Sequence, residues 1–139
     1  MITSWQERSK DLGLFIMRVG LGLMFMGHGF PKLAGGMAAW EQLGQAMSIF
    51  GFDAYPHVWG LFAAIAEFGG GLMLILGFVF RPFCVLLVGT MVVAATKHIH
   101  NGDGLGAASH AIEAAVVFAG FIFTGPGRYT VAYFDRDRI

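Results

Sequence analysis

The chain is short, apolar and electrically neutral. Of its 139 residues, 56% are hydrophobic and 13% are charged, and the formal net charge is zero. Soluble domains usually carry about 25% charged residues, so this composition excludes an ordinary soluble fold. The chain has no excess of positive charge, so its composition does not indicate a nucleic-acid partner. The single cysteine, Cys84, cannot form an internal disulfide or a dithiol redox pair.

The first long apolar run covers residues 12–30 and is interrupted only by Arg18. Its length matches the roughly 20 residues that a helix needs to cross the hydrocarbon core of a bilayer. It is longer than the apolar part of a signal peptide, and no A-x-A cleavage site follows it. We therefore expect a retained spanning helix, which Pro31 and the pair Gly35-Gly36 end.

A different pattern covers residues 37–50, where apolar residues recur at helical spacing. They are Met37, Trp40, Leu43, Met47 and Phe50, and polar residues occupy the other faces. This pattern predicts an amphipathic helix lying in the membrane interface. The alternative is a re-entrant segment buried as a lid.

Three further apolar runs cover residues 58–80, 83–99 and 107–124. Turn signals separate and end them: Arg81-Pro82, then residues 101–104, then residues 125–127. The sequence thus predicts an all-α protein, an integral membrane four-helix bundle with an interfacial amphipathic helix between the first two spans. We expect residues 1–139 to form one domain.

The distribution of basic residues predicts the orientation of this bundle. Four spans place both termini on one side, together with the basic residues Arg8, Lys10, Arg81, Arg128, Arg136 and Arg138. The other side carries only Lys32 and Lys97. The positive-inside rule then places both termini in the cytoplasm of a multi-pass protein. All five histidines lie at or near the opposite face.

Several ionisable residues lie in or at the edge of the spans, namely Arg18, Glu67, Lys97, His110 and Glu113. A charge in hydrocarbon costs roughly 2.5–3.5 kcal/mol, so each is expected to have a partner, a water-filled cavity or a function. Arg18 and Glu67 have similar expected depths, which predicts an ion pair between the first two spans. Small residues share the helix faces of Arg18, Glu67 and Glu113, so we expect these faces to pack inward.

The pair Arg18–Glu67 has two readings, because a buried ion pair can simply fix helix register or can belong to a functional site. His110 and Glu113 with His98 and His100 would be suitable metal ligands. No dense motif such as H-E-x-x-H is present, however, and the sequence predicts no metal site. His28 is read either as a helix-end histidine or as part of a binding site.

Four segments, in this order and spacing, resemble the DoxX family of small bacterial inner-membrane proteins. They are RVGLGLMFMGHGFPKL from Arg18, AEFGGGLMLILGF from Ala66, HAIEAA from His110 and TGPGRY from Thr124. The resemblance extends from about Phe15 to Asp135 and implies that Arg18, Glu67 and Glu113 are the family's intramembrane polar positions. It also implies a link to quinone-dependent oxidoreductase assemblies, in which members serve as membrane subunits or anchors.

Three functions remain open at this stage. The first is a membrane subunit that binds a quinone or quinol, with Arg18, His28, Glu67, Lys97 and Glu113 as binding residues. In that reading the phenylalanines Phe15, Phe25, Phe62 and Phe68 line the slot, and Glu67, Glu113, His110 and His98 relay protons. No haem, flavin or iron–sulfur motif is present, so electrons would come from a soluble or membrane oxidoreductase partner. The second function is a structural or scaffolding protein that forms homo- or hetero-oligomers, and the third is a small transporter or channel.

Overall fold

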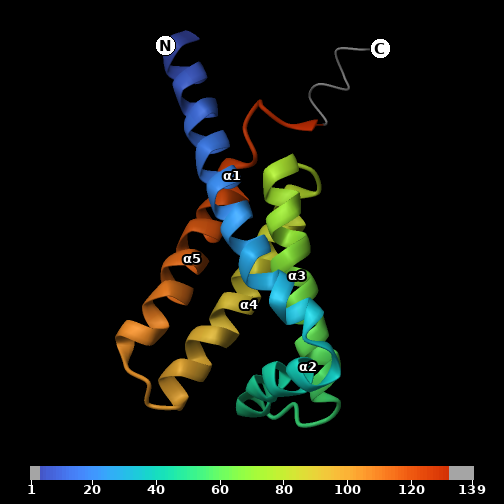
Figure 1. Ribbon diagram of the computed structural model, residues 1–139. Coiled ribbons are helices and arrows are strands. Elements are labelled where there is room, and N and C mark those ends of the chain that lie inside the picture. Colours follow the sequence, from blue (N-terminus) through green and yellow to red (C-terminus); the bar gives the residue numbers. More distant parts are fainter. Residues whose placement is uncertain (1–3, 132–139) are drawn as a thin grey trace.

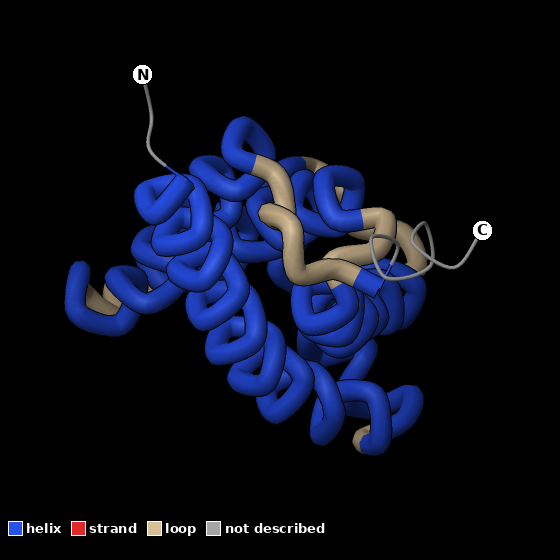
Figure 2. Tube along the Cα trace, turned by 90° about the horizontal axis from the view of Figure 1, so that it is seen from above, coloured by secondary structure: helices blue, strands red, loops and turns tan. Residues whose placement is uncertain are grey.

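The computed structural model describes residues 4–131 and is helical almost throughout (Figure 2). The helices are α1 (Ser4–Ala34), α2 (Gly36–Gly44), the 3₁₀ helix η1 (Gln45–Phe50), α3 (Pro56–Leu76), α4 (Phe80–His100) and α5 (Leu105–Thr124). Among these described residues, four helices, α1, α3, α4 and α5, are long and apolar enough to cross a membrane. The predicted all-α fold, with a short helix between the first two spans, is confirmed.

Several boundaries differ from the sequence prediction. Helix α3 ends at Leu76 and α4 begins at Phe80, so Arg81 and Pro82, the predicted turn, lie in the first turn of α4. Helix α1 begins at Ser4, eight residues before the apolar run, and continues through Pro31. Its first turns are polar and exposed, so they extend the helix beyond the apolar part of the bundle. The predicted amphipathic helix is divided into α2 and η1, which meet at Gly44.

Helices α1 and α3 pack closely because glycines face each other across their contact. An added Cβ at Gly22 would lie 2.6 Å from the carbonyl oxygen of Gly71, and one at Gly71 would lie 2.6 Å from that of Gly22. Gly29 packs directly against the backbone of Phe68. Small residues of this kind let membrane helices approach until their backbones touch.

The four long helices form two pairs, α1 with α3 and α4 with α5 (Figure 1). The pairs diverge toward the end of the bundle that carries α2, hereafter the α2 end. Farther from the α2 end, Leu87 of α4 packs over Gly70 of α3. The buried core joins the pairs, and Phe25 of α1 meets Phe118 of α5 with ring centroids 4.8 Å apart.

Helix α2 folds back against the first part of α3. Gly44 and Gly60 allow this contact, since a Cβ on Gly44 would overlap the backbone of Pro56 and one on Gly60 that of Trp40. The Trp40 indole Nε1 also donates a hydrogen bond to the carbonyl oxygen of Lys32, at 2.9 Å. The start of α1 and the end of the described chain lie at the opposite end of the bundle (Figure 1). The fold thus leaves α2 and η1 beside the opening between the helix pairs.

Candidate functional site

The most buried acidic group of the described chain is paired with a lysine. Lys32 Nζ lies 2.7 Å from Glu67 Oε1 and 2.6 Å from Oε2, so both carboxylate oxygens accept from one ammonium. Glu67 is only 3% exposed, whereas the Lys32 side chain is 36% exposed. The local packing explains this meeting: Gly29 brings α1 against Phe68, and Lys32 follows one turn later on the same face of α1.

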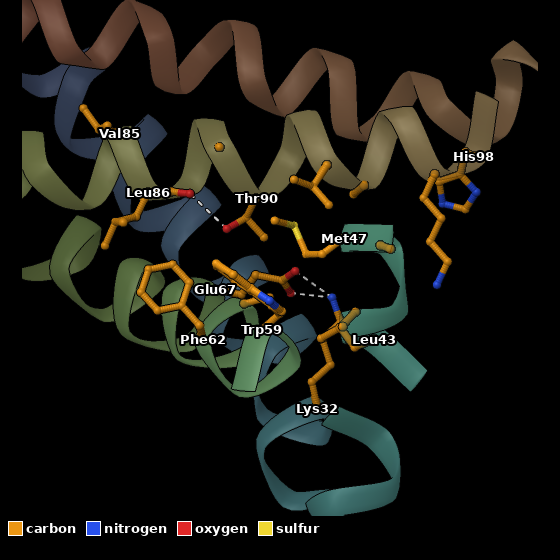
Figure 3. A pocket seen from close by; sticks show the side chains of 17 residues that line it. Lys32, Leu43, Met47, Trp59, Phe62, Glu67, Val85, Leu86, Thr90 and His98 are labelled. Carbon is orange, nitrogen blue, oxygen red and sulfur yellow. Dashed lines mark hydrogen bonds and ion pairs between the residues drawn. The ribbon is translucent and has the colours of Figure 1, made fainter. Parts of the chain in front are cut away.

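This ion pair lies on the wall of a groove of about 420 Å³ between α3 and α4, which α2 and η1 cover in part (Figure 3). Trp59, Phe62 and Glu67 of α3 face Leu86 and Thr90 of α4 across it. Val85 of α4 also contributes to the lining. Most of the lining is apolar; its remaining charged or titratable groups are Lys97 and His98, in the last turn of α4. An apolar groove with a few grouped polar side chains is the usual form of a small-molecule site.

A second, smaller cavity of about 150 Å³ lies on the other side of the pair. Its lining shares Lys32, Glu67 and His98 with the groove and adds His28 of α1 and His110 of α5. The two added imidazole rings have centroids 5.6 Å apart. The structure therefore brings together Glu67, Lys97, His98, His28 and His110, five of the residues that the sequence predicts for the site.

His98 connects this region with the surface. Its Nδ1 lies 2.8 Å from Asp103 Oδ2, in the turn after α4. Through this contact His98, which lines both cavities, is linked to an exposed carboxylate outside them. Among the described residues, no group of three or more His, Cys, Asp or Glu side chains could hold a metal ion.

The predicted Arg18–Glu67 ion pair is wrong. Arg18 Nη1 instead donates to the carbonyl oxygens of Leu74 and Ile75, each at 3.1 Å, in the last turn of α3. Leu74 follows Glu67 by seven residues, or about 10 Å along the helix, which is why the two charges do not meet. A cation at a helix C-terminus interacts favourably with its free carbonyl groups, so Arg18 stabilises the end of α3.

Arg18 is fully buried there, and its guanidinium lies 5.2 Å from the centre of the Phe15 ring. Within the described chain, its Nε and Nη2 atoms have no hydrogen-bond partner. Arg18 lines neither cavity around Glu67. Arg18 therefore lies apart from the two cavities around Glu67.

The expected inward packing of Glu113 is also wrong. Glu113 is exposed on the outer face of α5, and the buried face of that helix carries Ala108, Ala111, Ala114, Phe118 and Phe121. Small residues occur on both faces of α5, so a stripe of small residues did not identify the inner one. Of the expected slot phenylalanines, Phe62 lines the groove and Phe25 the smaller cavity, whereas Phe15 and Phe68 line neither.

Sequence reasoning missed Lys32 as the partner of Glu67 and Trp59 as part of the groove. Lys32 lies beyond Pro31, where the first helix was expected to end. A signal was nonetheless present, because lysine side chains near the ends of spanning helices reach toward polar groups over several ångströms. Lys32 follows the apolar run 12–30 by only two residues and lies in the last turn of α1, so it belonged among the candidates.

Comparison with known proteins identifies the family. The family model described as DoxX matches residues 13–100. The chain belongs to the DoxX family. This match begins within α1 and continues to the end of α4, so it includes Lys32, Glu67, Lys97 and His98. The resemblance seen in the sequence is confirmed.

Among curated proteins, the chain is similar to the inner membrane protein YqjF of Escherichia coli (strain K12). It is 28% identical over 129 residues, which cover 90% of this chain and 93% of the relative. No solved structure matches the chain. The comparisons thus establish a DoxX-family integral membrane protein, and the chemistry must be argued from the site itself.

Proposed function

We propose that this DoxX-family protein is a membrane subunit of a redox assembly in a bacterial inner membrane, and that its groove binds a quinone or quinol. The observation that carries the proposal is the position of the Lys32–Glu67 pair on the wall of an otherwise apolar groove. A quinone needs apolar surroundings for its ring and tail, and polar groups at its two carbonyl oxygens. The groove offers both within one cavity.

The size and lining of the groove suit such a ligand. Its volume of about 420 Å³ lies within the usual range of small-molecule pockets, roughly 300–1,000 Å³. Trp59 and Phe62 offer aromatic surface for a flat ring, and Val85 and Leu86 extend the apolar wall along α4. In this proposal the ring lies near Glu67 and the tail follows α4 toward Val85.

The charged and titratable residues around the quinone ring have different roles in this proposal. Lys32 is occupied by Glu67, whereas Lys97 has no hydrogen-bond or ion-pair partner among the described residues and can donate to a quinone carbonyl oxygen. Quinol oxidation releases protons, and His98 with Asp103 provides a route for them to the surface. The electrons would pass to a partner oxidoreductase, since the sequence has no haem, flavin or iron–sulfur motif.

The experiment is a binding titration in lipid nanodiscs with a short-chain ubiquinone. We expect saturable binding by the wild-type protein and at least about a tenfold weaker affinity for Lys97→Met, which loses a charged hydrogen-bond donor. Phe62→Ala should weaken binding similarly, because it removes ring contacts. Glu41→Gln, on the exposed part of α2, is the matched control and should bind like the wild type.

Two results would contradict the proposal. One is the absence of saturable binding by folded wild-type protein, both for ubiquinone and for a short-chain menaquinone. The other is binding that Lys97→Met and Phe62→Ala leave unchanged, because the quinone would then lie outside the groove.

A further inference from the structure

Glu113 is a charged residue inside a candidate membrane span, and no described residue pairs with it. It follows Leu105, the first residue of α5, by eight residues, or about 12 Å, which places it well inside the span. It is exposed on the outer surface of the bundle, and no described residue pairs with it. A carboxylate at this depth that faces lipid is strongly disfavoured, so a membrane protein normally gives such a group a partner.

The surroundings of Glu113 form a regular pattern. Six residues, spaced alternately four and three apart, lie along one face of α5. We call this face the α5 seam; its residues are Gly106, His110, Glu113, Val117, Gly120 and Thr124. All are exposed except the half-buried Val117. This heptad spacing is the one that places residues along the contact of two helices. An added Cβ at Gly106 or Gly120 would meet nothing within 4 Å, so the backbone there is open to close approach.

We propose that the α5 seam is the contact surface of a parallel homodimer, in which Glu113 of each copy pairs with His110 of the other. Two copies inserted with the same orientation are related by a two-fold axis along the membrane normal, so equivalent residues meet at equal depth. In such a contact each seam side chain enters a hole formed by four residues of the facing helix. His110 lies three residues, nearly one turn, before Glu113 and is therefore within reach of the facing carboxylate.

Charge complementarity selects a second copy as the occupant of this surface. The seam itself carries both an acidic residue and a titratable base, so two copies offer each other two identical pairs. His110 also lines the smaller cavity near Glu67. The second copy thus contributes Glu113 to the edge of that cavity. This inference does not depend on quinone binding.

The first test is disulfide crosslinking in native membranes, with Cys84→Ala as the background because Cys84 is the only natural cysteine. Gly120→Cys on the seam should form a covalent dimer upon oxidation. Gly20→Cys on α1 is the matched control, since Gly20 is also exposed and has open space around it, and it should remain monomeric. Crosslinking at Gly20 but not at Gly120, or crosslinking of Gly120 only to a different protein, would overturn the proposal.

The second test addresses the pair itself through energy transfer between labelled copies diluted into bilayers. We expect Glu113→Gln to raise the dimer dissociation constant by about tenfold, since two interhelical contacts are lost together. The exchanged variant His110→Glu/Glu113→His should restore most of the affinity, because it re-forms the pairs in reverse. Unchanged dissociation in folded Glu113→Gln would overturn the assignment of the pair, and a wild type that stays monomeric at high density would overturn the dimer.

Discussion

At the scale of single residues, the asymmetric exposure of Lys32 and Glu67 determines what each contributes. Glu67 is almost fully buried, whereas about a third of the Lys32 side chain is exposed. A buried charge that loses its partner is far more costly than an exposed one, because an exposed lysine head group still reaches water. The stability of the bundle should therefore respond differently to the loss of either partner.

We expect Lys32→Met to reduce the free energy of unfolding by about 3 kcal/mol, since it leaves the Glu67 carboxylate buried and unpaired. Glu67→Gln should cost only about 1 kcal/mol, because a neutral amide replaces the carboxylate. The double variant Lys32→Met/Glu67→Leu should recover most of the loss. Reversible unfolding in mixed micelles measures these values, and equal losses for both single variants would contradict the role assigned to the pair.

The residue scale is also where sequence reasoning was weakest. It correctly identified Arg18, Glu67 and Glu113 as charges within spans, and it correctly placed Arg18 and Glu67 on inward faces. It gave neither of these two its observed partner, and it placed Glu113 on the wrong face of its helix. The contact between α1 and α3 places Arg18 beside Leu74 and Ile75, about 10 Å along α3 from Glu67, although the apolar runs had suggested similar depths. For Glu113 the error was the side of the helix, because a helix turns by about 100° per residue. Depth estimates from apolar runs cannot supply rotation, so the partner of each charge was found only in the structure.

At the scale of elements, the α1–α3 contact positions the ion pair. Gly29 brings the two backbones together beside Phe68, one residue after Glu67. The number and order of the long helices could be predicted, because apolar runs of this length, separated by turn signals, are typical of membrane-spanning helices. The division of residues 36–50 into α2 and η1 was not, because both halves share the same apolar spacing.

A pair of glycine variants tests this contact. Gly29→Ala should lower the free energy of unfolding by about 2 kcal/mol, because the added methyl group would overlap the backbone of Phe68. Gly27→Ala is the matched control: it has open space and should leave stability unchanged or raise it by up to about 1 kcal/mol. Thermal unfolding in detergent compares them, and the account of the contact fails if Gly29→Ala is the better tolerated variant.

At the scale of the whole molecule, the two helix pairs and α2 create the groove, and the charge distribution predicts how it is placed in the membrane. The end opposite α2 carries most of the basic residues, which predicts that both termini are cytoplasmic. Arg136 and Arg138 contribute to this prediction but lie outside the described residues. The α2 end, with the opening of the groove, then lies on the outer side of the membrane.

Single cysteines in the Cys84→Ala background test this orientation. Asn101→Cys, in the turn after α4, should react with a membrane-impermeant maleimide on intact spheroplasts. Ser9→Cys, near the start of α1, should react only after the membrane is permeabilised. Labelling in the reverse order would show that the groove opens toward the cytoplasm.

The most direct measurement of the central claim is an electron cryo-microscopy map of the protein extracted with its native lipids. We expect density for a flat ring between Glu67 and Lys97, with an apolar tail that follows α4 toward Val85. A map in which Trp59 and Phe62 close onto α4, leaving no space for a ring beside the Lys32–Glu67 pair, would contradict it.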